Sequence, residues 1–376
     1  MIVQDDARAM SLGEYASSAA ETDRLPRDQL APALMGLFGE VGQILTTAKK
    51  RVREEDVYTE YHESVREEFG DALWYLSAVC SRLDVALADA FELEGEAMKK
   101  TIFASDVVDG PVSHVLSSAT PPKLEAALAA LGQAAATLLD IDRKGEVARQ
   151  LLKTFCARYA CALQAAGVAF SEVARQNLKK VRGRFILPDL ESLPTFDNKF
   201  EPEEQLPSQF EIKITQRKSG QSYLQWNDVF VGDPLTDNIL DRDDYRFHDV
   251  FHFGHAAILH WSPTFRSLIK QKRKSDKEYD EAQDGGRAIV VEEGLTAYIF
   301  ARAKKLRYFE GRSGVSYDLL KTVQQFVRGY EVDQCPLSLW ERAILQGYEV
   351  FRSVRDRNGG VVIGNRERRT LEYRAS

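Results

Sequence analysis

The chain has 376 residues, of which 44% are hydrophobic and 28% charged, and its formal net charge is −7. This length suits two or three domains, and the acidic balance argues against nucleic acid as a partner. No apolar run approaches the roughly 20 residues of a membrane span, and the N-terminus lacks the basic and apolar regions of a signal peptide. The four cysteines form no CxxC pair. We therefore expect a cytoplasmic protein with reduced cysteines and no membrane partner.

The first hundred residues predict a compact helical unit without strands. Helices are expected at 9–24, 28–50, 61–82 and 86–102. The second and third of these helices carry polar pairs at i, i+3 spacing, Glu40 with Gln43 and Glu68 with Asp71. Residues three apart lie on one face of a helix, so two antiparallel helices would bring the pairs face to face.

These two polar pairs stand in otherwise apolar helices, where carboxylates are costly unless a partner or a metal ion neutralises them. Glycines beside the pairs, Gly39, Gly42 and Gly70, would let the helices approach closely. Taken alone, an ExxE-like pair is a weak signal, because many solvated helix faces contain one. Clustered oxygen ligands suit a hard cation, so the four positions together predict a Mg²⁺ site.

A linker at 103–122 leads to a second helical segment, with helices expected at 123–140, 144–165 and 170–183. Its layout parallels the first unit, since Val85-Ala-Leu87 corresponds to Val168-Ala-Phe170. At the positions equivalent to the four polar residues this segment has no carboxylate: Gln133, Ala136, Leu151 and Thr154. We interpret it as a degenerate second copy; the alternative is an unrelated alanine-rich helical segment.

The remaining sequence predicts an α+β domain after a proline-rich, acidic linker at 186–210. Alternating apolar residues from Phe210 predict a hairpin or a three-stranded antiparallel sheet, and 360–363 one further strand. Helices are expected at 246–261, 287–306, 316–330 and 337–356. The chain is thus predicted to be mainly α, in three parts: 1–105, 106–190 and 205–376.

Four of the six histidines lie between positions 248 and 260. His248 and His252 have the i, i+4 spacing of many metal-binding helices, and Glu293 lies in an apolar helix downstream. We interpret these three residues as a transition-metal site, with Glu292 or His255 as a further ligand. The alternatives are hydrogen-bonded core histidines and a surface acidic pair.

Two other features of this part are less specific. The dipeptide His248-Asp249 is too common to indicate an HD-type phosphohydrolase. The basic stretch 270–287 predicts a solvated loop or, alternatively, a phosphate-gripping lid that uses Lys272, Arg273, Lys274 and Arg287.

At the acidic pairs the sequence resembles the MazG-like nucleoside triphosphate pyrophosphohydrolases, the all-α NTP pyrophosphatases, whose pattern is ExxE, a spacer and ExxD. Residues 10–105 resemble the family directly, and 123–185 as the degenerate copy. The resemblance implies that Glu40, Glu68 and Asp71 are catalytic acids that bind Mg²⁺, with Mn²⁺ as an alternative. The metal activates water for attack on a nucleotide's α-phosphate, which releases pyrophosphate and a monophosphate. It also implies a homodimer or an internal pseudo-dimer.

Six further residues are candidates for substrate binding: Lys49, Lys50, Arg53, Trp74, Asn177 and Lys180. The basic residues after the first pair could meet the triphosphate, or form a solvated helix end. Trp74 could stack on a base or pack in the core. Asn177, Lys180 and Arg184 resemble the run that ends the family's last helix, and they could complete a nucleotide pocket or form a solvated helix end.

Gln43 departs from the family pattern, which has Glu at this position. Its amide oxygen can bind a metal but carries no charge, which leaves reduced activity, an altered substrate or a nucleotide sensor open.

Residues 205–376 resemble the C-terminal domain that accompanies some MazG-like proteins, at Gly232-Asp-Pro-Leu-Thr-Asp-Asn238, Tyr245-Arg-Phe-His-Asp-Val-Phe-His252 and Trp340-Glu-Arg-Ala-Ile-Leu-Gln-Gly-Tyr348. The resemblance implies nucleotide metabolism without an established chemistry for this domain. The leading prediction is Mg²⁺-dependent NTP pyrophosphohydrolysis, in removal of non-standard nucleotides or in phage conflict. The alternatives are a non-catalytic nucleotide-binding or signalling protein, and a hydrolase whose main site is the His/Glu cluster.

Overall fold

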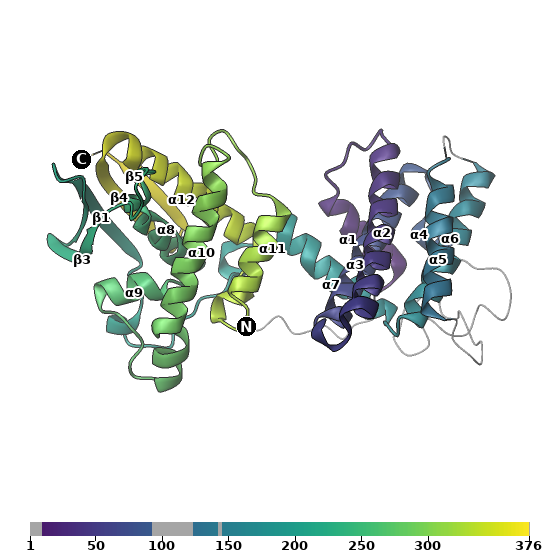
Figure 1. Cartoon of the computed structure of the whole chain (residues 1–376), viewed down its shortest axis with the longest axis horizontal. Helices are drawn as coiled ribbons and strands as arrows, with labels where there is room; N and C mark the ends of the chain where they lie inside the picture. Colours follow the sequence, from purple (N-terminus) through teal and green to yellow (C-terminus); the bar gives the residue numbers. More distant parts are fainter. Residues whose placement is uncertain (1–9, 92–122, 142–144, 376) are drawn as a thin grey trace. The chain divides into compact units, whose positions relative to one another are not determined.

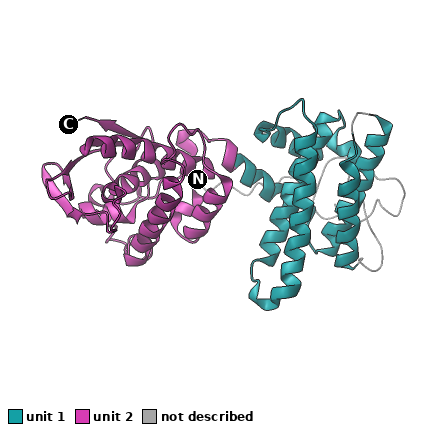
Figure 2. Cartoon of the chain, turned by 45° about the horizontal axis from the view of Figure 1, so that its top comes forward, with its two compact units in different colours: residues 1–182 teal, residues 183–376 magenta. Residues whose placement is uncertain are grey.

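The computed structural model describes residues 10–91, 123–141 and 145–375, and the chain divides into two compact units, Met1–Arg182 and Gly183–Ser376 (Figures 1 and 2). The predicted mainly α fold with a small antiparallel sheet in the C-terminal region is confirmed. None of the described helices combines the length and the apolar character that a membrane span requires.

Unit 1 contains helices and no strand in its described part. The helices are α1 (Leu12–Thr22), α2 (Ala31–Glu54), α3 (Tyr61–Arg82), α4 (Leu87–Ala90), α5 (Leu124–Leu138), α6 (Glu146–Ala165) and α7 (Phe170–Phe185), which continues into unit 2. The helix expected at 86–102 lies mostly outside the described residues. A capping box begins α1, because Ser11 and Glu14 each accept a hydrogen bond from the other's backbone amide.

The two helical hairpins of unit 1, α2–α3 and α5–α6, continue into the next helix in the same way. After α3, Asp84 has a left-handed φ of 54°, and after α6, Gly167 has a φ of 68°. In both places the next amide donates to the carbonyl five residues earlier, at 3.0 and 3.1 Å, as in a Schellman motif. The following helix starts three residues after each left-handed residue, at Leu87 and Phe170. The hairpins therefore share one connection geometry, as an internal repeat requires.

One hydrophobic core joins the two hairpins. α2 packs against both α3 and α5, and α6 packs against α5. Tyr159 of α6 is fully buried, with its ring edge-on to Phe69 of α3 at 5.4 Å. Its hydroxyl donates to the Phe69 carbonyl oxygen at 2.8 Å. The two predicted helical segments thus fold together around a common interior.

Unit 2 is an α+β unit with a five-stranded antiparallel sheet in the order β3-β2-β1-β4-β5. The strands are β1 (Gln209–Gln216), β2 (Ser222–Trp226), β3 (Val229–Leu235), β4 (Gly359–Asn365) and β5 (Thr370–Arg374). The helices are α8 (Asp249–Gly254), α9 (Pro263–Ile269), α10 (Gly286–Lys304), α11 (Tyr317–Phe326) and α12 (Leu337–Arg357). Two of these elements, β5 and α9, were not predicted from the sequence.

The helix expected at 246–261 is shorter and less regular than predicted. α8 covers only six residues and continues as a π-helical turn, His255–Leu259, which ends at left-handed His260. β1 alternates buried and exposed residues, and its buried residues Phe210 and Ile212 share a core with α8 and α12. The histidine-bearing helix is therefore held inside the unit rather than at its edge.

The acidic segment 186–210 was predicted to be a linker. In the structure it is instead anchored inside unit 2 through Asp197. Asp197 is completely buried and accepts hydrogen bonds from Arg266 at 2.6 Å and from Arg366 at 2.7 Å. It also accepts one from the backbone amide of Leu206 at 2.8 Å. Two arginines around one carboxylate satisfy charges that would otherwise be costly to bury.

Neither interpretation of the basic stretch 270–287 accounts for Arg273. Its side chain is fully buried and donates to Asp284 and to Glu331, each at 2.7 Å. Its neighbours Lys272 and Lys274 are more exposed. Arg273 thus forms a structural ion-pair network and has no free donors for a phosphate.

Candidate functional site

α2 and α3 bring three predicted catalytic acids together. Glu40, Glu68 and Asp71 each offer a carboxylate oxygen within 4.8 Å of the others, and all three side chains are half-buried. Burial, followed by the nearby charges of Asp71 and Glu68, raises the pKa of Glu40 to about 7, although the charge of Lys180 opposes the shift. Like charges this close disfavour full ionisation, so the cluster is suited to a cation.

α7, from the second helical segment, completes this acid cluster. Lys180 donates to Glu67 at 2.8 Å and also to Asp71. Buried Asn177 donates to the other oxygen of Asp71 at 3.1 Å, and accepts from the Tyr15 hydroxyl at 2.8 Å. Two of the three residues that the resemblance marked on this helix therefore touch a predicted catalytic acid, whereas Arg184 instead donates to Glu341 at 2.8 Å.

The close approach of α7 to α3 depends on Gly70. A Cβ atom at this position would lie 2.8 Å from the Cβ of Asn177. Real Cβ atoms do not approach other atoms this closely, so a side chain here would push the two helices apart. Gly70, beside the second polar pair, therefore allows the close approach of α7 to α3 rather than that of α2 to α3.

The basic residues of α2 lie away from the acids. Lys49, Lys50 and Arg53 are exposed. At 1.5 Å and 100° per residue, Lys49 lies about 14 Å along the helix from Glu40 and about 180° around its axis. Gln43 lies one turn from Glu40 and is also exposed. The structure therefore places Gln43 near the cluster, but not the three basic residues.

Trp74 lies one turn beyond Asp71 on α3 and is half-buried against the core of unit 1. Its indole N–H donates to the buried hydroxyl of Thr22 at 2.9 Å, and its ring packs edge-on against Tyr75 at 5.0 Å. These contacts favour a packing role for Trp74 over stacking on a base.

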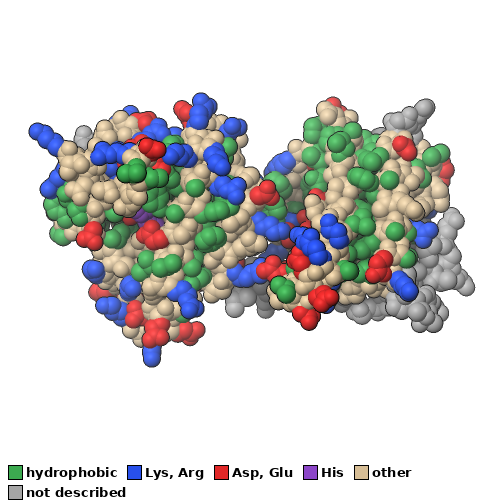
Figure 3. Space-filling model, viewed as in Figure 1, with side chains coloured by type: hydrophobic (Ala, Val, Ile, Leu, Met, Phe, Trp, Pro, Cys, Tyr) green, Lys and Arg blue, Asp and Glu red, His purple; other side chains and the backbone are tan. Residues whose placement is uncertain are grey.

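In unit 2 the predicted His/Glu residues also converge. His252 is completely buried, with Nδ1 3.1 Å from Glu292 and Nε2 3.2 Å from Glu293. His248 Nε2 lies 3.5 Å from Glu293. On the face drawn in Figure 3, unit 2 shows only a small purple patch of histidine surface, in keeping with the burial of these imidazoles.

The ligand-type atoms of unit 2 form two groups that share His252. In one, it lies with His248 and Asp249, and in the other with His255 and Glu292; within each group the atoms are no more than 4.8 Å apart. In the sequence, Asp249 stands out only as part of a common dipeptide. Its signal was its position three residues before His252, which is one turn of the same helix.

Glu292 is the anchor of the second group. It is completely buried and accepts hydrogen bonds from the Ser262 hydroxyl at 3.1 Å and the Thr264 amide at 3.0 Å. It also lies 2.8 Å from His255 Nδ1. Burial alone would raise the pKa of Glu292, but the charge of His252, together with the hydrogen bond and charge of His255, lowers it to about 2.

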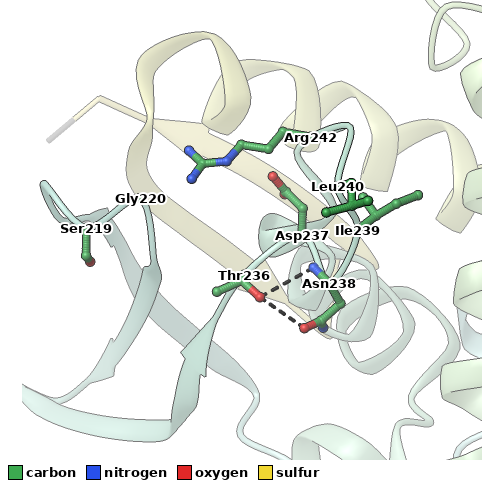
Figure 4. A pocket seen from close by; sticks show the side chains of 8 residues that line it. All are labelled: Ser219, Gly220, Thr236, Asp237, Asn238, Ile239, Leu240 and Arg242. Atoms are coloured by element: carbon green, nitrogen blue, oxygen red, sulfur yellow. Dashed lines mark hydrogen bonds between the residues drawn. The ribbon is translucent and has the colours of Figure 1, made fainter.

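A pocket of about 430 Å³ opens beside the end of β3, and its lining includes Ser219, Gly220, Asn238 and Arg242 (Figure 4). The guanidinium of Arg242 extends toward Gly220, and Thr236 is hydrogen-bonded to Asn238.

Asp237, at the pocket wall, accepts from both the backbone and the guanidinium of Arg246, at 3.0 and 2.8 Å. This ion pair ties the end of β3 to the segment that leads into α8. The Asp-containing stretch around position 237 therefore positions the histidine helix.

Comparisons with known proteins found a family model that matches the C-terminal unit and a phage protein that is similar to part of the chain. A family model described as the MazG C-terminal domain matches residues 191–376. The "Gene 37 protein" of Mycobacterium phage L5 is 36% identical over 61 residues, which are 16% of this chain and 54% of that protein. The chain thus spans about half the length of this curated relative. No solved structure matches the chain.

Proposed function

We propose that this chain, which belongs to the MazG-like proteins, hydrolyses a nucleoside triphosphate to the monophosphate and pyrophosphate at the acid cluster of unit 1. The observation that carries the proposal is the convergence of Glu40, Glu68 and Asp71 from two helices. The raised pKa of Glu40 adds support, because a site built from mutually repelling carboxylates gains most from a bound cation.

The donor set fits Mg²⁺, or Mn²⁺ in its place. Three carboxylates and the amide oxygen of Gln43 are hard oxygen ligands of the type that these ions prefer. When bound, the ion would polarise phosphate oxygens and lower the pKa of a water molecule. Glu40, Glu68 and Asp71 would hold it, and Gln43 would add an uncharged ligand.

Side chains beside the acid cluster would orient its carboxylates and contact the substrate. Asn177 fixes one oxygen of Asp71, and Lys180 fixes the other. Lys180 also brings a positive charge into contact with Glu67 and Asp71, so it could meet a phosphate oxygen bound at this cluster. Glu40 is assigned to the ion, because a bound cation would offset the burial and the carboxylate repulsion that raise its pKa to about 7 in the metal-free protein.

A second candidate is a nucleotide sensor without turnover. It is favoured by the contacts of Lys180, whose single ammonium group already offsets part of the negative charge of Glu67 and Asp71. Gln43 also lowers the negative charge available to a metal ion. In this case the acid cluster would bind nucleotide and divalent ion but would not release pyrophosphate.

The experiment is a screen of NTPs and dNTPs, standard and modified, with the full chain, Mg²⁺ or Mn²⁺, and pyrophosphate detection. We expect turnover of at least one nucleotide, and a loss of at least about 100-fold in Asp71→Asn, since even outer-shell changes cost 10- to 100-fold. Glu63→Gln, at an exposed position of the same helix, is the matched control and should retain activity. Nucleotide binding without pyrophosphate release by the wild type would favour the sensor.

A further inference from the structure

The inner face of α8 carries a histidine with unusual surroundings. His252 has no exposed surface, and neither of its ring nitrogens makes a hydrogen bond with suitable geometry. Even so, each nitrogen lies close to a carboxylate oxygen, of Glu292 on one side and Glu293 on the other. Buried polar atoms without hydrogen bonds are rare in native proteins and call for an explanation, such as an ion.

His248 is oriented to bring a second nitrogen to the same place. Its Nδ1 donates to the carbonyl oxygen of Tyr245 at 2.9 Å, and the two rings stack in parallel at 4.3 Å. With the proton held on Nδ1, the lone pair of Nε2 is free. This atom lies 3.5 Å from Glu293 and 3.9 Å from Asp249. A backbone acceptor on the far nitrogen is the usual support of a metal-binding histidine.

The separations between these groups match ligands around an ion better than direct hydrogen bonds. Charge-assisted N–H···O bonds are about 2.7–2.9 Å long, whereas the nitrogen–oxygen distances here are 3.2, 3.5 and 3.9 Å. Metal–ligand bonds of about 2.0–2.1 Å in a tetrahedral site put neighbouring ligand atoms about 3.3 Å apart. His248, Asp249 and His252 lie within 4.8 Å of one another, and the two oxygens of Glu293 approach the two imidazoles at 3.2 and 3.5 Å, close to the spacing expected of ligands around a small ion.

We propose that His248, Asp249, His252 and Glu293 bind a divalent transition-metal ion of the Zn²⁺, Fe²⁺ or Mn²⁺ type. Two imidazoles with two carboxylates are a donor set of this class, since imidazole suits Zn²⁺ and Fe²⁺ and carboxylate oxygen suits Mn²⁺. The site is separate from the acid cluster of unit 1 and does not depend on nucleotide hydrolysis there. Asp249, adjacent to His248 in the sequence, supplies the ligand that completes the set.

Glu292 acts as a positioning residue behind this site. It lies between the Nδ1 atoms of His252 and His255 and is itself held by Ser262 and the Thr264 amide. A carboxylate behind a ligating imidazole orients the ring and increases its basicity.

Glu293 opens the site toward solvent. Its side chain is 37% exposed, whereas those of His248 and Asp249 are nearly buried. A water molecule or an oxygen atom of a small ligand can therefore approach the ion from that side. Such an open position distinguishes reactive metal sites from closed structural ones.

Metal content and Co²⁺ spectroscopy test the proposal without any measurement of turnover. The full chain with Asp71→Asn serves as the background, so that the acid cluster of unit 1 contributes little metal. We expect about one equivalent of transition metal by mass spectrometry after dialysis, or, if the metal is lost, visible absorption bands on titration with Co²⁺. Adding Glu293→Gln or His252→Ala should reduce the Co²⁺ affinity by at least about 10-fold.

His62→Ala, an exposed histidine of unit 1, is the matched control and should leave the Co²⁺ signal unchanged. Glu293→Gln changes a partly exposed side chain, so it provides the decisive comparison if His252→Ala fails to fold. The proposal would be overturned if the background protein contained no bound metal and also gave no Co²⁺ spectrum. An equal signal in the Glu293→Gln protein would remove Glu293 from the ligand set and overturn the site as drawn.

Discussion

The acid cluster of unit 1 and the His/Glu cluster of unit 2 place the same residue type in opposite environments. Burial and neighbouring carboxylates raise the pKa of Glu40 to about 7. Glu292 is buried more deeply, yet His252 and His255 lower its pKa to about 2. A cluster of carboxylates must take positive charge from elsewhere, here from Lys180 and, as we propose, from a divalent cation. A mixed cluster can hold a proton or a metal ion on its own nitrogens.

The comparison predicts that neutralising a glutamate has opposite effects on stability in the two units, and the larger effect is expected in unit 2. Glu292→Gln removes a buried negative charge from beside His252 and His255 while leaving their nitrogens in place. We expect the free energy of unfolding to fall by about 3–5 kcal/mol, the usual cost of breaking a buried charged network. Urea unfolding of the full chain at pH 7 would measure it.

Glu281→Gln is the control for this change, because the Glu281 side chain is 70% exposed and forms an ion pair with Lys277 at a distance of 3.8 Å. Such a surface pair is worth at most about 1 kcal/mol, so stability should change little. A loss below about 1 kcal/mol in Glu292→Gln would show that Glu292 does not hold the histidines together, and the contrast between the two clusters would fail.

In unit 1, Glu40→Gln should stabilise the metal-free protein above neutral pH. The pKa of Glu40 is raised from 4.5 to about 7 in the folded chain, so ionisation costs folding energy as pH rises between these values. Wild-type stability should therefore fall from pH 5 to pH 8 in EDTA. The variant should be about 1–2 kcal/mol more stable at pH 8 and nearly equal at pH 5, after allowance for partial solvent screening.

Urea midpoints at the two pH values, with and without Mg²⁺, would test this expectation. Added Mg²⁺ should restore wild-type stability at pH 8, because it binds the ionised cluster in the folded state only. It should have a much weaker effect on the variant. A wild-type midpoint that shows no decline between pH 5 and pH 8 would contradict the assigned repulsion among Glu40, Glu68 and Asp71.

The helices of unit 1 and their facing acids could be predicted because local rules determine them. The i, i+3 spacing of Glu68 and Asp71 fixes a shared face whatever the tertiary structure. Apolar periodicity gave α3 with the bounds that the structure has, Tyr61–Arg82. The contact of α7 with Asp71 was not deducible from spacing alone, since it depends on how Gly70 allows two distant segments to meet.

Unit 2 was harder to predict because the structure of several segments depends on contacts with residues that are distant in the sequence. The basic run around Arg273 is typical of a solvated loop, but its carboxylate partners lie 11 and 58 residues away. The six-residue α8 and its π-helical continuation depend on packing rather than helix propensity. Asp249 was missed because its ligand-type neighbours include His252 on the next turn, whereas the dipeptide pattern pairs it only with the adjacent His248.

The smallest expected effect concerns Gln43, the position where the acid cluster lacks a carboxylate. Gln43→Glu adds a charge one turn from Glu40 at an exposed site, where a charge pair is worth at most about 1 kcal/mol. We expect Mg²⁺ affinity, measured from the Mg²⁺ dependence of the thermal midpoint, to rise by up to about 5-fold.

The second helical segment supplies a matched control, because Ala136 occupies the position that the repeat equates with Gln43 and is equally exposed. Ala136→Glu adds the same charge without neighbouring catalytic acids and should leave Mg²⁺ affinity unchanged. Equal gains in both variants would attribute the effect to net charge, and no gain in Gln43→Glu would place position 43 outside the ion's ligands. A gain confined to Gln43→Glu would show that the two hairpins differ by their ligands rather than by their fold.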